Sequence, residues 1–259
     1  MDKTDGKYLE KLRLDGKVAV VCGGLGLIGK EVVQAFAEAG ANIYVLDIKS
    51  DEKDKTENVS FISFDVTDAN SYEKVFAAIM TEAGKIDIFV NLSYPRTEDW
   101  DTHLEDVKAE SWKKNIDMQL NTCCLLTRTV AELMRKRGTK GSIVNFGSIY
   151  GVVAPDFEIY PKDMTSPAAY AAIKGGIISF SRYAASYYGK HGIRVNCLCP
   201  GGVFDNQDEQ FVKNYGKKTC LKRMAQAEEI AAATLFLASD AASYITGTAF
   251  MVDGGLTVL

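Results

Sequence analysis

Short runs of Val, Ile and Leu alternate along the chain with longer stretches in which apolar residues recur at helical spacing. Continuous apolar runs are typical of strands that are buried on both faces of a parallel sheet. The pattern predicts seven strands, at residues 17–22, 42–46, 59–64, 86–92, 141–146, 194–199 and 248–252. It predicts helices at residues 30–39, 71–83, 110–137, 167–189 and 228–238.

This order of elements indicates parallel strands joined by crossover helices. We expect an α/β fold of one domain, a doubly wound (Rossmann) fold whose seven-stranded, mostly parallel sheet carries helices on both faces. A chain of 259 residues fits a single domain of this kind. Ligands of such sheets bind beyond the carboxyl ends of the strands, so functional residues are expected directly after strands.

Composition and charge narrow the choice of partners. The chain has 30 Lys and Arg against 34 Asp and Glu, a net charge of −4. Without a basic footprint, neither nucleic acid nor a membrane surface is an expected partner. The sequence has no apolar stretch of membrane-spanning length and no apolar secretory core at its start, so we expect a cytoplasmic protein.

The cysteines and histidines of the sequence do not predict a metal centre. The six cysteines form no CxxC motif, and the only two histidines are His103 and His191. Neither a zinc site nor a disulfide framework is predicted, and the thiols are expected to be reduced and mostly buried.

A glycine-rich turn follows the first predicted strand. Gly24 to Gly29 fits GxGxxG, and Asp47 ends the second strand 21 residues after Gly26 (47 − 26). Glycines let the backbone approach a pyrophosphate at a helix N-terminus, and a carboxylate at the strand end binds the adenosine ribose hydroxyls. Asp47 would repel the extra phosphate of NADP, so NAD(H) is the preferred cofactor, with NADP(H) as the alternative because Lys49 lies nearby.

The same turn nearly fits a P-loop, since Gly24, Gly29 and Lys30 match GxxxxGK. The next residue of a P-loop is Ser or Thr, which binds magnesium. Here that position is Glu31. A carboxylate repels nucleotide phosphates, so a nucleoside triphosphatase is the weaker interpretation.

Tyr170 and Lys174 are spaced to share one helix face. A phenol is a poor base at neutral pH, but a nearby ammonium and an oxidised nicotinamide stabilise the phenolate. Ser148 follows a predicted strand, where its hydroxyl can face the same cleft. The alternative is structural, with Tyr170 packed in the core and Lys174 reaching solvent.

Taken together, these motifs resemble the classical short-chain dehydrogenase/reductase family over nearly the whole chain. The motifs that carry the resemblance are the glycine turn, Asp65-Val66, the 141–151 strand and turn, Tyr170 with Lys174, Arg194-Val195-Asn196 before Pro200-Gly201, and Asp253-Gly254-Gly255.

The resemblance implies a role for each matching residue. Tyr170 would exchange a proton with the substrate oxygen, Ser148 would hydrogen-bond that oxygen, and Lys174 would bind the nicotinamide ribose. Cofactor contacts are implied for Gly23, Gly24, Gly26, Leu27, Ile28, Asp47, Asp65, Val66, Asn91, Tyr170, Lys174, Pro200, Gly201 and Val203. A homotetramer or homodimer, built on the helices at 110–137 and 167–189, is also implied.

Several positions depart from the family pattern. Leu27 stands where classical members carry a glycine of the turn, and the usual Asn-Asn-Ala-Gly is replaced by Asn91-Leu92-Ser93-Tyr94. Gln119 replaces the asparagine of the proton relay and is a catalytic candidate with an extra methylene. After Pro200-Gly201 the threonine that often meets the carboxamide is absent, since Gly202-Val203 follows.

The loop between Ser148 and Tyr170 is longer than usual, and the insertion at 153–166 is predicted to contact substrate or else to be a bare surface loop. The 203–223 segment is predicted to form further substrate-side loops of a single 1–259 dinucleotide-binding and catalytic domain, preceded by a polar extension at 1–13. These segments, with Tyr94-Pro95-Arg96, offer mainly polar side chains: Arg96, Asp156, Glu158, Tyr160, Asn206 and Gln207.

A polar lining suits a small sugar-like substrate, so we expect NAD(H)-dependent hydride transfer to or from a secondary alcohol or carbonyl. The 200–207 stretch and the insertion are similar to family members in bacterial flagellin-modification and surface-sugar pathways. Two other functions stay open. One is a catalytically silent NAD-binding regulatory protein, and the other is a nucleotide-sugar epimerase or dehydratase with internal hydride transfer.

Overall fold

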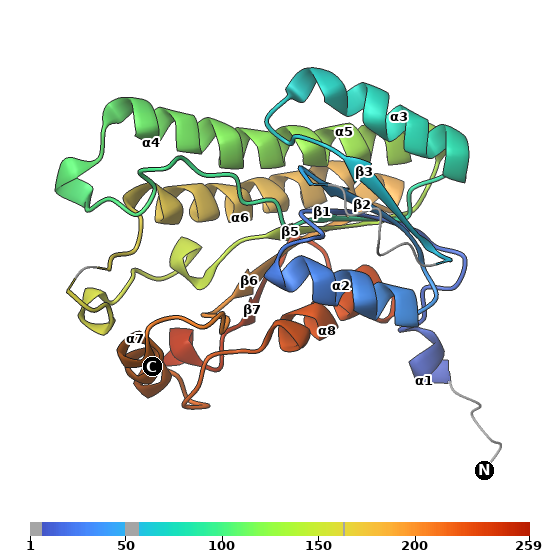
Figure 1. The fold of residues 1–259 in the computed structure, drawn as a ribbon. Coiled ribbons are helices and arrows are strands. Elements are labelled where there is room, and N and C mark those ends of the chain that lie inside the picture. Colours follow the sequence, from blue (N-terminus) through green and yellow to red (C-terminus); the bar gives the residue numbers. More distant parts are fainter. Residues whose placement is uncertain (1–6, 50–56, 163) are drawn as a thin grey trace, which may run out of the picture.

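The computed structural model describes residues 7–49, 57–162 and 164–259, which form one parallel sheet between layers of helices (Figure 1). Residues 1–6 of the predicted polar extension and residue 163 of the insertion lie outside the described residues. The strands of the sheet are β1 (Val18–Cys22), β2 (Asn42–Asp47), β3 (Val59–Ser63), β4 (Ile88–Asn91), β5 (Ser142–Phe146), β6 (Arg194–Pro200) and β7 (Ala249–Val252).

The strands are arranged in the order β3-β2-β1-β4-β5-β6-β7, and every pairing is parallel. This arrangement confirms the predicted single-domain doubly wound α/β fold. The chain moves outward from β1 in one direction through β2 and β3 and in the other through β4 to β7, so the switch point lies between β1 and β4. The loops after those two strands separate there and leave room for a ligand.

Helices cover both faces of the sheet. On one face lie α2 (Leu27–Glu38) and α8 (Ala227–Ala238), and on the other α3 (Tyr72–Ala83), α5 (Thr122–Arg137) and α6 (Ala168–Tyr188) (Figure 1). Because successive strand residues face opposite sides, β1 contributes Val18, Val20 and Cys22 to one core and Ala19 and Val21 to the other. Burial on both faces explains the continuous apolar runs in the sequence.

Three helical segments differ from the prediction. The helix after the glycine turn begins at Leu27 rather than residue 30, because Lys30 N–H already donates to Gly26 O. The long helix predicted at 110–137 consists of α4 (Ala109–Asn115), a π-helical segment (Ile116–Asn121) and α5. Residues 209–217, expected to be loop, form α7 (Glu209–Lys217), whose N-terminus is capped by Asp208.

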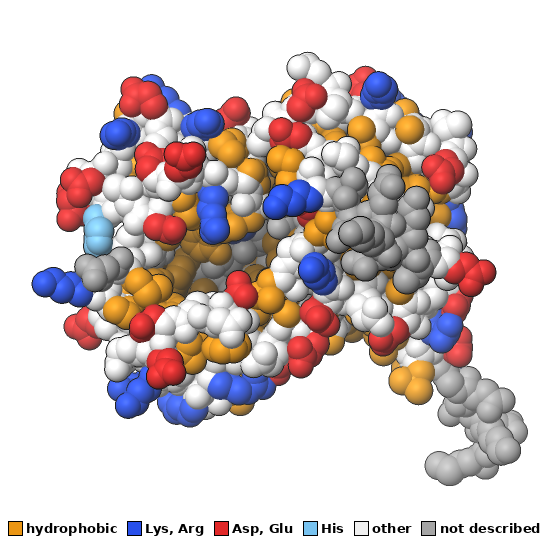
Figure 2. Space-filling view, in the orientation of Figure 1, with side chains coloured by type: hydrophobic (Ala, Val, Ile, Leu, Met, Phe, Trp, Pro, Cys, Tyr) orange, Lys and Arg blue, Asp and Glu red, His pale blue; other side chains and the backbone are white. Residues whose placement is uncertain are grey.

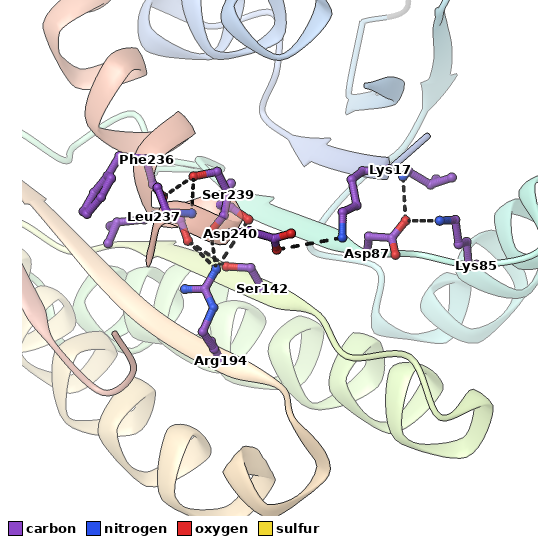
Figure 3. Close-up of polar contacts among 12 residues, drawn as sticks. Lys17, Lys85, Asp87, Ser142, Arg194, Phe236, Leu237, Ser239 and Asp240 are labelled. Atoms are coloured by element: carbon purple, nitrogen blue, oxygen red, sulfur yellow. Dashed lines mark hydrogen bonds and ion pairs between the residues drawn. The ribbon is translucent and has the colours of Figure 1, made fainter. Parts of the chain in front are cut away.

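Polar side chains at the amino ends of the strands form a network with the end of α8 (Figure 3). Arg194, the first residue of β6, donates hydrogen bonds to the carbonyls of Leu237, Ala238, Ser239 and Ile245. Burial lowers the pKa of Arg194. The carbonyls of Leu237, Ala238 and Ser239 are ones that a helix C-terminus leaves unpaired, so the guanidinium acts as a cap for α8.

A buried carboxylate binds a backbone amide at the same end of the sheet. Asp87, which is 7% exposed, accepts from Val18 N at 2.8 Å and pairs with Lys85 at 3.0 Å. Ser142 Oγ donates to Leu237 O at 3.0 Å. The polar groups at this end of the sheet are therefore paired with one another (Figure 3).

The short helix α1 comprises Lys7–Glu10. No helix within the described ranges is both long and apolar enough to cross a bilayer. All six cysteines are free thiols; only Cys220 is exposed.

Candidate active site

Two adjoining clefts lie at the carboxyl ends of the strands, on either side of the switch point. Their volumes are about 840 Å³ and 510 Å³, and both are lined by Gly23, Gly26, Leu92 and Tyr94. In Figure 2 the surface is hollowed near its middle, with hydrophobic side chains deep in the hollow. Shared walls make the two clefts one continuous site long enough for an extended ligand.

The glycine turn has the geometry that a close backbone approach requires. Gly23 adopts φ +79°, and a Cβ at this position would lie 2.9 Å from Leu92 C. A Cβ on Gly29 would lie 2.2 Å from Gly23 O, so only glycine lets the helix begin so near the strand. Gly26, Leu27 and Ile28 line the cleft, whereas Gly24 faces Val45.

The larger cleft contains the residues expected at the adenosine end. Asp47 accepts hydrogen bonds from Leu25 N at 3.0 Å and Ile48 N at 2.8 Å, so its carboxylate is tied to the glycine turn. Lys30 and Lys49 line the same cleft. Asp65 and Val66 lie on its wall, and Asp65 Oδ1 accepts from Thr67 N and Oγ1.

The smaller cleft brings together residues from three distant parts of the sequence. Tyr170 and Lys174 from α6 line it with Pro200, Gly201 and Val203. Lys174 is 7% exposed, and its Nζ donates to Phe146 O at 3.0 Å. That bond joins the middle of α6 to the end of β5 and fixes the ammonium beside the cleft.

Ser148 lies in the turn that follows β5. Its side chain is 5% exposed and accepts from Tyr150 N at 3.1 Å, capping the short 3-10 helix Ile149–Gly151. A Cβ on Gly151 would lie 2.7 Å from Lys174 C, so this turn packs directly on α6. Ser148 and the Tyr170–Lys174 helix face therefore belong to the same region of the molecule.

Gln119 and Asn91 are buried and line neither cleft. Gln119, on the π-helical segment, is 5% exposed, and neither its Nε2 nor its Oε1 has a hydrogen-bond partner among the described residues. An unpaired buried amide costs free energy, so a contribution to stability does not explain Gln119. Asn91 instead accepts from Ser93 N and Oγ.

An aromatic group surrounds Tyr170 and was not predicted from the sequence. The rings of Tyr94 and Trp100 lie 6.0 Å and 6.3 Å from the Tyr170 ring, at 79° and 73° to it. Asn115, 2% exposed, anchors the loop that carries them, because it accepts from Thr97 N and donates to Thr97 Oγ1. The only signal was Tyr94 at a position where the family usually has glycine.

The insertion packs against α7. Ile159 is buried with Phe211 and Tyr215, and Asp156 pairs with Lys218 at 2.7 Å. Tyr160 OH is bonded to Tyr150 OH at 3.2 Å. Tyr215 OH in turn accepts from Gly202 N, next to the smaller cleft. The insertion and α7 therefore form one packed unit beside the site.

Comparison with known proteins identifies the class. A family model described as Enoyl-(Acyl carrier protein) reductase matches residues 26–257. The chain belongs to the short-chain dehydrogenase/reductase family, as its motifs implied, and it is an oxidoreductase of the kind that acts on CH–OH groups.

Three relatives place the chain within this family. A short-chain dehydrogenase from Leptospira borgpetersenii with bound NAD+ has a TM-score of 0.88 and 35% identity, over 96% of this chain and 95% of that one. A gluconate 5-dehydrogenase from Burkholderia cenocepacia, in complex with NADP and tartrate, has a TM-score of 0.84 and 27% identity, over 97% and 99%. The Post-translational flagellin modification protein A of Campylobacter coli is 31% identical over 93% of this chain and 98% of its own length.

Proposed function

We propose that this protein is an NAD(H)-dependent oxidoreductase that transfers hydride between nicotinamide and a secondary alcohol or carbonyl of a small polar, sugar-like compound. The observation that carries the proposal is the smaller cleft, where Tyr170 and Lys174 line the same space as Gly26 and Ile28 of the glycine turn. A proton-transferring side chain is useful there only if the nicotinamide end of a dinucleotide reaches the same space.

Each catalytic candidate has a task that its position supports. When bound, the nicotinamide supplies or accepts the hydride. Tyr170 gives its phenolic proton to a carbonyl oxygen being reduced, or takes the proton of a hydroxyl being oxidised. Ser148 donates a hydrogen bond to that oxygen as charge develops on it. Lys174 stabilises the phenolate and binds the ribose. The side-chain amide of Gln119 takes part in the proton relay.

NAD(H) is the proposed preference, with NADP(H) as the weaker alternative. Two backbone amides fix the carboxylate of Asp47 at the end of β2. In that position it would accept hydrogen bonds from the ribose hydroxyls of NAD and repel the 2′-phosphate of NADP. Lys30 and Lys49 reduce that repulsion. We expect kcat/KM to favour NAD over NADP, and Asp47→Asn to narrow the ratio by about tenfold.

The substrate class follows from the walls of the smaller cleft and from relatives. Arg96 and Asp205 line this cleft, so polar and anionic groups find partners in it. The solved structure of the gluconate 5-dehydrogenase relative is a complex with tartrate, which is a hydroxy acid. The relative in flagellin modification suggests a surface-sugar pathway. Two residues that were expected to contact substrate have partners within the protein: Asp156 pairs with Lys218, and Gln207 donates to Val203 O.

The insertion at 153–166 is proposed to contact substrate through its packed unit with α7, in the 203–223 segment. Tyr160 and Tyr150 share one hydrogen bond between two hydroxyls. Tyr150 belongs to the 3-10 turn that Ser148 caps, so this bond joins the insertion to the turn that carries Ser148.

Assembly and location are part of the same proposal. A homodimer or homotetramer is proposed through α5 and α6, where Phe180, Tyr183 and Tyr187 form a stack with ring distances of 6.2 Å. Tyr183 is 65% exposed, and exposed aromatic rows favour a partner surface. Free thiols fit a cytoplasmic protein. Residues 1–259 are proposed to act as one catalytic domain.

The test is NADH oxidation across a panel of keto acids, ketoses and simple ketones. We expect turnover of polar carbonyl compounds and transfer of deuterium from deuterated NADH to the carbonyl carbon. Tight NADH binding without turnover of any compound would favour the silent regulatory protein. Retained NAD with altered sugar and no net NADH change would favour the epimerase or dehydratase.

A further inference from the structure

Tyr94 occupies the centre of an aromatic group beside the catalytic tyrosine. Its ring centroid lies 6.0 Å from both the Trp100 and the Tyr170 centroids, at interplanar angles of 83° and 79°. Edge-to-face pairs at this separation are attractive and hold ring orientation. The Tyr170 ring therefore contacts two aromatic rings that restrict its motion.

Lys174 belongs to the same arrangement. Its Nζ lies 5.5 Å from the centroids of both Tyr94 and Tyr170. A cation at this distance is attracted to the face of a ring. Tyr94 thus contacts both members of the proton-transferring pair.

The position of Tyr94 is fixed from the side away from the cleft. Trp100, 5% exposed, donates from Nε1 to Tyr94 OH at 2.8 Å. The loop between the two aromatic residues is tied to α4, because Asn115 bonds Thr97 through both its amide atoms. Burial raises the pKa of Tyr94, so the hydroxyl that accepts the bond from Trp100 is neutral.

We propose that Tyr94 is a positioning residue for Tyr170: held by Trp100, its ring covers one side of the Tyr170 ring and keeps it oriented for proton transfer. The inference rests on the proposed function for its kinetic consequence but not for its structural one. The glycine that the family pattern has at this position has no ring and cannot provide such a cover.

The structural arm of the test uses nitration of tyrosines by tetranitromethane, followed by peptide mass spectrometry. The fully exposed Tyr244 in the same sample is the internal standard. We expect Tyr94→Ala to raise Tyr170 nitration severalfold relative to Tyr244, whereas Tyr94→Phe, which keeps the ring, leaves it near wild type. Equal nitration of Tyr170 in Tyr94→Ala and wild type overturns the proposal.

The kinetic arm separates positioning from substrate binding. We expect Tyr94→Ala to lower kcat by about 10–100-fold while KM changes less than about threefold, since small displacements of a reacting group have effects of this size. The solvent deuterium isotope effect on kcat should rise, because proton transfer becomes slower. Tyr94→Phe should restore most of kcat. A raised KM with unchanged kcat would make Tyr94 a substrate contact and overturn the proposal.

Two outcomes keep the arms distinguishable. If wild type turns over no compound, the proposed function fails, and nitration alone decides whether Tyr94 covers Tyr170. If Tyr94→Ala does not fold, Tyr94→Leu replaces it: loss of the aromatic ring should raise Tyr170 nitration, and no rise contradicts the inference.

Discussion

The two ends of one sheet treat polar side chains in opposite ways. At the amino ends of the strands, Arg194 binds four carbonyls and Asp87 binds a backbone amide and Lys85 (Figure 3). At the carboxyl ends, the amide of Gln119 is buried without a partner among the described residues, and Arg96 lines an open cleft.

The difference separates stability from function. A buried polar group with all its bonds made contributes to the folded state, whereas one with bonds unmade costs free energy and is retained for another reason. Substitutions at the amino end should therefore lower the free energy of unfolding without changing kcat. Substitutions at the carboxyl end should stop chemistry with little effect on stability.

Tyr170→Phe should have the largest effect. The ring and its contacts with Tyr94 and Trp100 remain, but the exchangeable proton is lost. We expect kcat to fall by about a thousandfold, within the range for loss of a general acid or base. Melting temperature and NADH affinity should stay near wild type. A variant that retains more than a tenth of kcat would show that the proton travels by another route.

Arg194→Met should give the largest loss of stability. The substitution keeps the length of the side chain but removes the guanidinium donor of four carbonyls. Two of the four keep a second donor, since Ser142 Oγ bonds Leu237 O and Asn196 Nδ2 bonds Ile245 O. We expect about 3 kcal/mol less free energy of unfolding in urea, at unchanged kcat per folded molecule. Arg194→Lys, with one donor group, should lie between the two. A loss of kcat without loss of stability would break the contrast between the ends.

Gln119→Leu should sharpen the contrast. Replacing an unpaired buried amide by an apolar side chain of similar size should leave stability equal or higher. If the amide takes part in the proton relay, kcat should fall by roughly tenfold, which corresponds to a rise of about 1.4 kcal/mol in the activation free energy. Gln119→Asn should recover part of the rate. Thermal melts and steady-state rates on the same samples measure both sides; a destabilised, fully active Gln119→Leu enzyme would contradict this reading.

Asp87→Asn should have the smallest effect. The amide oxygen still accepts from Val18 N, and only the half-exposed pair with Lys85 is lost. We expect about 1 kcal/mol or less in urea unfolding and unchanged kinetics. Asp87→Ala, which also removes the acceptor, should cost more. Equal losses in the two variants would mean that the backbone bond contributes nothing.

Local patterns were enough to predict most of the fold. Strands buried on both faces give continuous apolar runs, and a glycine turn has few alternatives, so the sheet and the turn were visible in the sequence. The helix α7 was missed because its apolar residues Phe211 and Tyr215 pack on the insertion, a contact between distant segments. The π-helical segment was also missed, since an apolar period alone does not distinguish it from α-helix.

The site was predictable only in part. The motifs placed Tyr170, Lys174, Asp47 and Val203 on cleft walls, where the structure also has them. Gly24 and Asn91, also expected at the cofactor, line neither cleft, since Gly24 packs on Val45 and Asn91 is buried against Ser93. The contacts of Tyr94 and the unpaired state of Gln119 depend on tertiary packing, which no local pattern encodes.

A crystal structure with NAD+ and a bound hydroxy acid would test the central claim most directly. The account predicts the dinucleotide along both clefts, with its nicotinamide beside Tyr170. The substrate hydroxyl should lie about 2.6–3.2 Å from both Tyr170 OH and Ser148 Oγ. A nicotinamide bound away from Tyr170, or a hydroxyl beyond the reach of both side chains, would contradict it.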